Sequence, residues 1–213
     1  MLGFCGETKR RVRSVVLVST ALCFLCVLAL AAKEFVKPGA KPARTYPLHD
    51  EHKDEAVTAG VDPYDNPEKA EIFTVKWAEE GFLPVFLIVT NDGDQPISLT
   101  DMQAQLITSH RDKLSVATGD DLYRRLAHIS TGHPYPFPIP RRVKGAVSKK
   151  ALDEIDRAPF SAKAVEPHST QSGFVFFDVS GISSPQAGGR FYLTGLRDAK
   201  GAELLYFEIP FQN

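Results

Sequence analysis

The first 32 residues constrain this chain more than any other stretch. An uncharged run of nineteen residues, 14–32, follows a basic cluster made of Lys9, Arg10, Arg11 and Arg13. As a helix, a run of this length reaches about 28 Å, close to the hydrocarbon thickness of a bilayer. Because positive flanks stay in the cytoplasm, we expect residues 1–13 to form a cytoplasmic basic region and the chain after Lys33 to cross the membrane.

Two fates of this leader remain open. Residues 14–32 are longer than the usual core of a signal peptide, which favours a transmembrane anchor. Ala29-Leu30-Ala31 is a small-x-small triplet of the kind that signal peptidase accepts, which favours cleavage near Ala31. The sequence therefore predicts a single-pass protein of the inner membrane with its domain on the outer, periplasmic side. The alternative is a secreted or periplasmic domain.

Cysteine placement and net charge narrow the chemistry of the exported part. The three cysteines of the chain, Cys5, Cys23 and Cys26, all lie in the leader. We therefore expect no disulfide, thiol nucleophile or thiolate metal site in the exported part. Removing the first 31 residues changes the formal net charge from −1 to −4. A mildly acidic domain has no overall attraction to nucleic acid, and we expect no nucleic-acid partner.

Residues 33–68 are rich in Pro, Ala, Lys, Asp and His and show no apolar periodicity. This composition predicts a flexible linker, with the folded domain over residues 69–213. The linker contains His49-Asp50-Glu51-His52, which offers two imidazoles but no further ligands on a fixed scaffold. We therefore expect no metal site there.

Apolar patterning after residue 68 predicts a mainly β domain. Residues 73–77 alternate as Phe-Thr-Val-Lys-Trp, and 83–89 are continuously apolar, as in a strand that is covered on both faces. The Asn-Asp-Gly-Asp sequence at 91–94 predicts a turn between paired strands. The parity of apolar residues changes within 97–106, which requires a bulge or a change of sheet near residue 100.

Three further strands are predicted near the C-terminus, at 173–179, 190–196 and 202–209. The last two are expected to form a hairpin in which Gly201 takes a left-handed conformation. Between the two β clusters, the spacing of Leu122, Leu126 and Ile129 predicts a short helix. A second helix is predicted after an N-cap at Ser148, with Leu152 and Ile155 inward and Lys149–Asp153 and Lys150–Glu154 ion pairs outward.

Short alternating strands with Gly and Asp turns predict an antiparallel sandwich of two sheets, with a helical insertion at about 118–160. The string at 81–93, Gly-Phe-Leu-Pro-Val-Phe-Leu-Ile-Val-Thr-Asn-Asp-Gly, is followed by Pro-Ile-Ser-Leu at 96–99. In these residues the chain resembles bacterial exported immunoglobulin-like accessory domains. The resemblance implies a fold class only: mainly β, an antiparallel Ig-like β-sandwich behind a transmembrane or signal helix.

Catalytic signatures are absent from the sequence. It holds no Gly-x-Ser-x-Gly elbow, His-Glu-x-x-His, phosphate-binding glycine loop or dinucleotide fingerprint. The histidines beyond residue 68 have no partner at ligand spacing, and His168-Ser169-Thr170 on an extended chain does not share a proton. We therefore expect no catalytic residue, cofactor or bound metal.

The segment 133–142 is His-Pro-Tyr-Pro-Phe-Pro-Ile-Pro-Arg-Arg, in which prolines at every second position favour an extended rod. Such a rod is either a stiff loop packed on the domain or a pre-ordered arm for a partner. The predicted partner-binding residues are Tyr135, Phe137, Ile139, Arg141, Arg142 and Lys144. The expected function is a non-enzymatic interaction or assembly module that binds an envelope protein. The alternatives are an extracytoplasmic protein that binds a small ligand or metal and, third, a hydrolase with unrecognised residues.

Overall fold

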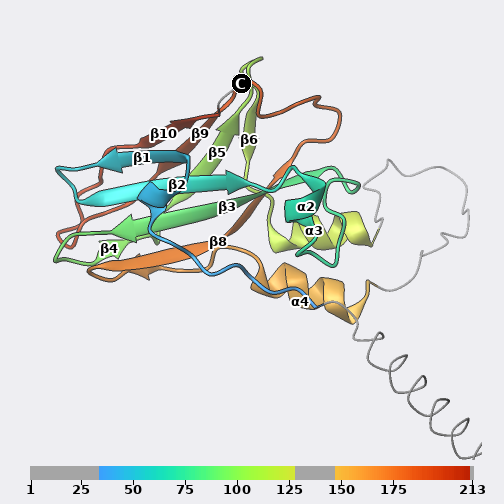
Figure 1. Ribbon diagram of the computed structural model, residues 1–213, viewed down its shortest axis with the longest axis horizontal. Coiled ribbons are helices and arrows are strands. Elements are labelled where there is room, and N and C mark those ends of the chain that lie inside the picture. Colours follow the sequence, from blue (N-terminus) through green and yellow to red (C-terminus); the bar gives the residue numbers. More distant parts are fainter. Residues whose placement is uncertain (1–33, 128–146, 212–213) are drawn as a thin grey trace, which may run out of the picture. The chain divides into compact units, whose positions relative to one another are not determined.

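The structure is a computed structural model that describes residues 34–127 and 147–211 (Figure 1). The predicted basic region 1–13 and apolar segment 14–32 lie outside the described residues. Within the described ranges, no helix combines the length and hydropathy that a membrane crossing requires.

The first sheet is built around a strand without a polar face. β3 (Phe82–Asn91) is buried at every position, as its continuously apolar sequence predicted. Both of its neighbours run antiparallel to it, and the four-stranded order is β1 (Leu48–His52), β2 (Val57–Pro63), β3 and β8 (Ser169–Asp178).

The second sheet has the opposite character, because only one of its faces is buried. In β5 (Gln103–Ile107) and β9 (Arg190–Thr194), buried residues alternate with exposed or half-buried ones. This pattern is typical of an antiparallel sheet with one solvated face. Its four-stranded order is β10 (Phe207–Pro210), β9, β5 and β6 (Lys113–Ser115).

The two sheets share one hydrophobic core, as in a β-sandwich. Odd-numbered residues of β3 and β8, such as Val85 and Phe177, pack with Leu106, Phe191 and Phe207 of the second sheet. A two-stranded pair, β4 (Ile97–Ser98) with β7 (Ala164–Val165), lies beside them. The prediction of a mainly β, antiparallel fold is confirmed.

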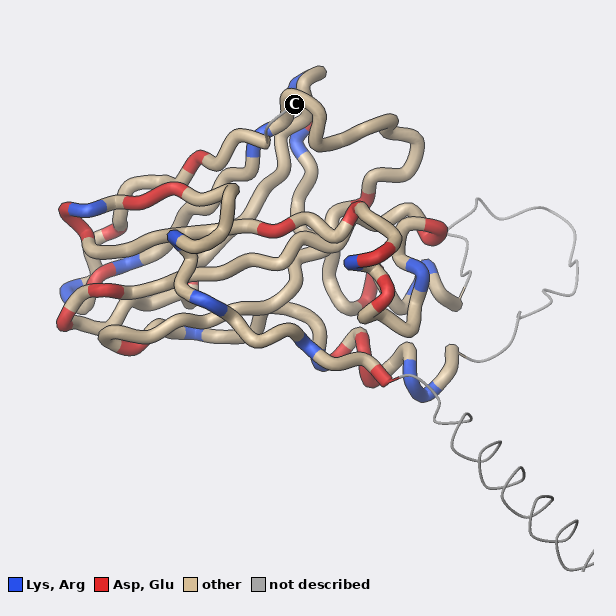
Figure 2. Tube along the Cα trace, viewed as in Figure 1, with Lys and Arg blue, Asp and Glu red and all other residues tan. Residues whose placement is uncertain are grey.

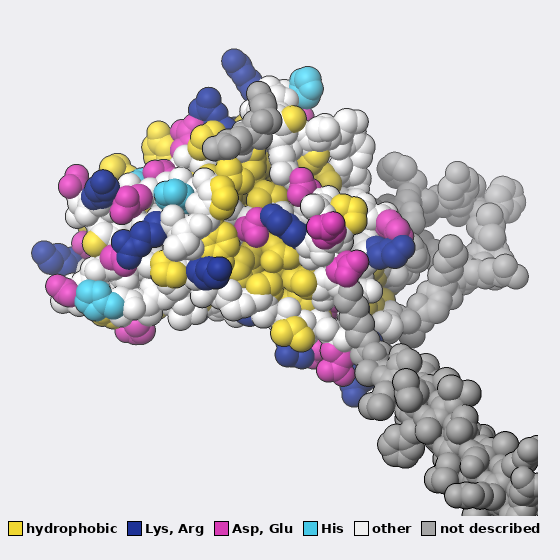
Figure 3. Space-filling view, viewed as in Figure 1, with side chains coloured by type: hydrophobic (Ala, Val, Ile, Leu, Met, Phe, Trp, Pro, Cys, Tyr) yellow, Lys and Arg dark blue, Asp and Glu magenta, His cyan; other side chains and the backbone are white. Residues whose placement is uncertain are grey.

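A third layer covers the outer face of the first sheet. Even-numbered residues of β3 and β8 pack there against Leu122 of α3 (Gly119–Leu126) and Ile155 of α4 (Lys149–Arg157). The same layer holds Phe35, η1 (Ala43–Thr45) and the turns around α2 (Pro67–Ala70). On the face in Figure 3, hydrophobic side chains gather in the middle, with charged ones around them. These contacts explain why β3 needs two apolar faces.

The prediction of a flexible linker over 33–68 is wrong for its described part. This range contains η1, β1 and β2, and Phe35–Asn213 forms one compact unit. The sequence pattern did not predict β2 because its middle residues, Ala59 and Gly60, are small and give no apolar alternation. Both lie buried between close neighbours, and a Cβ at Gly60 would come within 3.0 Å of the Ala43 carbonyl oxygen. The folded unit therefore begins before the predicted boundary at residue 69.

The predicted strand at 73–77 is also wrong, because these residues form turns. Phe73 and Trp77 are both buried in the third layer, where both contact the ring of Phe176. Residues 91–94 do form a bend, but β3 does not pair with the strand that follows. The buried Asn91 side chain donates to the carbonyls of Gln95 and Val165, so the chain is directed into β4 and then the second sheet. The predicted change of sheet near residue 100 is confirmed.

Both predicted helices are present, with partly different faces. Ser148 caps α4 by accepting from the Ala151 N–H, and Ile155 is buried as predicted. Leu152, predicted inward, is 39% exposed, and Ala151 takes the inward position instead. Glu154, predicted to pair with Lys150 on the outward face, is instead buried. The predicted C-terminal hairpin is confirmed as β9 with β10, with Gly201 at φ +84°.

Candidate functional site: a groove at the edge of the two sheets

The sequence-predicted site residues are not placed by the structure. The predicted partner-binding residues Tyr135, Phe137, Ile139, Arg141, Arg142 and Lys144 lie outside the described residues, as do Lys9, Arg10, Arg11 and Arg13. The candidate site therefore comes from the described part of the fold.

A groove with a volume of about 410 Å³ opens where the two sheets meet beside β5 and β8. Its apolar lining comes from both sheets and from the segment after α4, namely Leu99, Met102, Ala104, Val116, Phe160, Ala162 and Val175. Its polar lining consists of Thr100, Gln103, Gln105, Ser115 and Lys163. The volume lies within the range of small-molecule sites in proteins.

The groove exists because β6 pairs with only part of its neighbour β5. β6 pairs with β5 only from Gln105 to Ile107, and the next residue after β6, Val116, already bridges to Phe177 of the first sheet. The first half of β5 is thus left without a neighbour on this side. The segment after α4 forms another wall, since the Phe160 N–H donates to the Phe174 carbonyl at 2.9 Å.

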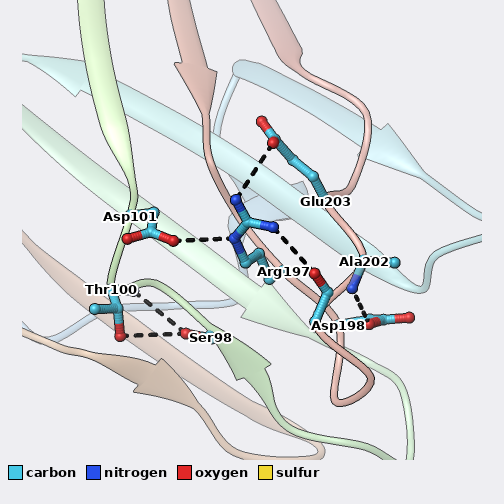
Figure 4. Close-up of polar contacts among 8 residues, drawn as sticks. Ser98, Thr100, Asp101, Arg197, Asp198, Ala202 and Glu203 are labelled. Carbon is cyan, nitrogen blue, oxygen red and sulfur yellow. Dashed lines mark hydrogen bonds and ion pairs between the residues drawn. The ribbon is translucent and has the colours of Figure 1, made fainter.

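An arginine clamp fixes the wall that contains Leu99 to Gln103. Arg197 Nε donates to Asp101 Oδ2 at 3.0 Å, and its Nη1 donates to the Gly201 carbonyl at 3.0 Å (Figure 4). Glu203 approaches the same guanidinium at 3.7 Å. The backbones of Arg197 and Ser98 also exchange hydrogen bonds of 2.8 and 3.0 Å. The start of β5 is therefore held by both side-chain and backbone contacts.

Gly195 permits this close approach. It has φ +78°, and a Cβ at this position would lie 2.1 Å from the Asp101 carbonyl oxygen. A side chain would therefore force β5 and the β9–β10 connection apart. The groove wall depends on this glycine as well as on the clamp.

At the opposite edge of the sandwich, carboxylates and a histidine of β1 and the following turn connect the first sheet to the second. His52 stacks on Phe207 at 4.0 Å between ring centroids, and its Nδ1 lies 2.9 Å from Glu55 Oε2. Asp50 accepts from the Glu208 N–H, and Glu55 accepts from the Leu205 N–H, each at 3.0 Å. The sequence placed His49–His52 in a linker, whereas these residues belong to β1 and join the two sheets.

Metal-binding geometry is not found among the described residues, where no three His, Cys, Asp or Glu side chains are grouped to hold an ion. His168, for which no partner was expected, lies 2.9 Å from Asp94, and both side chains are exposed. The two residues are distant in sequence, and the pair forms only through the fold.

The outer face of the second sheet is the main uncovered sheet surface in the described part. We call it the open face and define it by Gln103, Gln105, Ile107, Arg190, Tyr192, Thr194, Tyr206 and Glu208. Tyr206 is 56% exposed, and its ring lies 6.0 Å from that of Tyr192. Arg190 forms an ion pair with Glu208. Partial burial, and then the hydrogen bond with Glu208, raise the pKa of Tyr192.

Charged residues of both signs are interspersed along the strand ends and helices (Figure 2). The chain coloured there shows no long stretch of one sign, which agrees with a formal net charge near zero. A surface of this kind gives little long-range attraction to a highly charged polymer.

The described fold thus defines the class: a mainly β protein of two stacked antiparallel sheets, with one covered sheet and one open face. A scan against family models and a search of curated proteins found no match to this chain. Function is therefore inferred from the geometry and chemistry of the site itself.

Sequence reasoning missed the groove and the open face for different reasons. The groove depends on where β6 leaves β5, which no local pattern encodes. The open face did leave a signal, because Tyr192 and Arg190 alternate with buried Phe191 and Leu193 in β9. That alternation showed which residues face outward, but not that the other sheet is covered on its outer side.

Proposed function

We propose that this protein is a non-enzymatic interaction or assembly module, tethered by a single N-terminal helix on the outer side of the inner membrane. The basic cluster and the uncharged run 14–32 support the tether. Cleavage near Ala31 would instead give a free periplasmic domain, and the mass of the mature N-terminus distinguishes the two.

We further infer an immunoglobulin-like fold for residues 35–213. β2, β3 and β8 correspond to strands A, B and E of such a domain, and β5, β9 and β10 correspond to C, F and G. β6 then extends the second sheet beside C, and β1 adds an edge strand to the first sheet. The helices α3 and α4 form an insertion between β6 and β8, the strand that corresponds to E.

The observation that carries the proposal is the asymmetry of the two sheets. The first sheet is covered on both sides, whereas the open face of the second presents the Tyr192–Tyr206 pair and the Arg190–Glu208 ion pair. Tyrosine and arginine are enriched among the residues that dominate binding energy at interfaces. We propose that an envelope protein binds at this face.

Residues 133–150 are proposed as a second part of the partner surface. Their alternating prolines favour a pre-ordered arm that loses little entropy on binding. The adjoining Arg141, Arg142 and Lys144 supply positive charge for an acidic partner.

Site-specific photocrosslinking in native membranes tests the proposal. A photoreactive residue at Tyr206 is expected to give one discrete adduct, and the same residue at Asp156, on exposed α4, is the matched control. Tyr192→Ala is expected to weaken the Tyr206 adduct at least about fivefold, by removing about 1 kcal/mol of contact. Equal adducts from both positions, or none from Tyr206, would refute binding at the open face.

The predicted arm is tested separately. Tyr135→Ala with Phe137→Ala, and Arg141→Glu with Arg142→Glu, are expected to reduce recovery of the same adduct. Unchanged recovery would remove the arm from the proposal and leave the open face in place.

The groove favours a second candidate function, binding of a small extracytoplasmic ligand. It is a concave site whose apolar lining is joined by a few polar side chains, as in small-molecule sites generally. The groove and the open face share Gln103 and Gln105 at their border, whereas the apolar lining of the groove lies outside the open face.

A further inference from the structure

The groove has one charged residue among its described lining. Lys163 is exposed and lines the groove together with apolar side chains and neutral hydroxyl and amide groups. Its backbone position is fixed, because its carbonyl accepts from the Leu99 N–H at 2.8 Å. No described carboxylate lines the groove, so the charge of the site is that of a single cation.

An acidic residue beside the groove lining in sequence, Asp101, is already engaged. Asp101 lies between the lining residues Thr100 and Met102, and it accepts from Arg197 Nε at 3.0 Å (Figure 4). Arg197 also contacts Glu203, which places these charges in their own network. Lys163 has no ion pair of this kind among the described residues.

We propose that the groove binds a small amphipathic carboxylate, with its apolar body on the lining of Leu99, Met102 and Val175 and its carboxylate at Lys163. This inference rests on the second candidate function, ligand binding, and does not depend on the open face. One positive charge beside neutral hydrogen-bonding groups matches a monoanion better than a phosphate dianion or a cation.

The apolar lining supplies the other half of the recognition. Met102, Val116 and Phe160 are only partly buried against the core, so an apolar ligand would remove their remaining surface from water. Met102 adds an adaptable side chain that can fit bodies of different shape. Because Arg197 and Gly195 hold the wall in place, little ordering is required when the ligand enters.

The experiment is calorimetric titration of the full-length protein in lipid nanodiscs, with empty nanodiscs as the blank. The probes are phenylbutyrate, phenylbutanol and phenylbutylammonium, which share one apolar body and differ in the charge of the head group. Phenylbutyrate is expected to bind about tenfold more tightly than the alcohol, the effect of one charge-assisted hydrogen bond. The ammonium probe is expected to bind more weakly than the alcohol.

Variants locate the binding. Lys163→Gln is expected to remove the preference for phenylbutyrate over phenylbutanol, and Lys163→Arg is expected to retain it. Lys53→Gln, in the β1–β2 turn at the opposite edge, is the matched control and is expected to change nothing. Ser115→Phe, at an exposed position of the groove lining, is expected to weaken both probes.

The outcomes separate two failures. Equal binding of phenylbutyrate and phenylbutanol would overturn the carboxylate assignment and leave small-ligand binding intact. Binding of none of the probes would overturn both the assignment and the second candidate function. A preference that survives Lys163→Gln, or binding unchanged by Ser115→Phe, would place the site elsewhere and overturn the proposal.

Discussion

Glu154 connects α4 to the turns before β3, and its removal is the sharpest test of how the third layer is held. Its side chain is fully buried, at 0% exposure. Its Oε2 accepts from the Thr74 N–H at 2.6 Å and from Thr74 Oγ1 at 2.5 Å. Its Oε1 accepts from Trp77 Nε1 at 2.6 Å.

The cost of removing it follows from the donors that it leaves behind. In Glu154→Ala, the Trp77 indole N–H and the Thr74 backbone N–H lose their acceptor, at about 1–3 kcal/mol each. The Thr74 hydroxyl can turn to another partner and adds less. We expect a loss of about 4 kcal/mol in the free energy of unfolding. Glu154→Gln keeps the shape of the side chain, but its amide NH₂ faces one of the donors that the carboxylate accepted from. We expect this variant to lose about 2 kcal/mol in the free energy of unfolding.

Urea unfolding of the full-length protein measures this loss, and Trp77 is a built-in probe because it is the single tryptophan of the chain. Asp156→Ala, an exposed position on α4, is the matched control and is expected to change stability by less than about 0.5 kcal/mol. A Glu154→Ala loss below about 1 kcal/mol would refute the reasoning. It would show that water or a neighbouring group replaces the carboxylate.

Two further predictions concern the groove wall and helix α3. Gly195→Ala is expected to destabilise the protein by more than about 2 kcal/mol, since the new Cβ would meet the Asp101 carbonyl in a left-handed conformation. Gly181→Ala shares φ +78° but has no atom within 4 Å of the new Cβ, so only about 1 kcal/mol is expected in the same thermal or urea assay; equal losses would contradict the steric argument. Hydrogen bonds from the Thr118 hydroxyl and N–H, in the capping box at the start of α3, hold the pKa of Asp121 below its usual value. A carboxylate whose pKa is lower in the folded state stabilises the protein at pH values above the unfolded-state pKa of about 3.9. This stabilisation is lost as the pH falls through the folded-state pKa. Asp121→Asn is therefore expected to cost about 0.5–1 kcal/mol at pH 7, and in acid unfolding curves the difference from the parent protein is expected to shrink steadily as the pH falls below about 4; a difference that stays constant on acidification would contradict it.

Local signals that report one dominant effect were sufficient for much of the fold. The continuous apolar run of β3 predicted a strand covered on both faces, because each face of a strand must then be buried. Ser148 predicted the start of α4, and Gly201 predicted a left-handed turn, because each depends on the backbone chemistry of a few neighbouring residues. The change in parity near residue 100 predicted the passage between sheets.

Features that depend on distant neighbours were beyond local patterns. β2 reads as a linker because its small residues become core only when η1 and β3 pack against them. Glu154 reads as half of an exposed ion pair, and only the position of Thr74 and Trp77 makes its burial favourable. The same holds for the turns at 73–77, where the alternation of Phe73 and Trp77 serves a layer above the sheet.

Local sequence patterns were sufficient for the central strand β3, the N-cap of α4 and the mainly β class, since periodicity and turn chemistry act over a few residues. Packing between distant segments decides which sheet is covered, where β6 leaves β5 to open the groove, and that Lys163 lines this groove. These features arise from contacts between residues far apart in the chain, such as Arg197 with Asp101, and their energies depend on the completed fold.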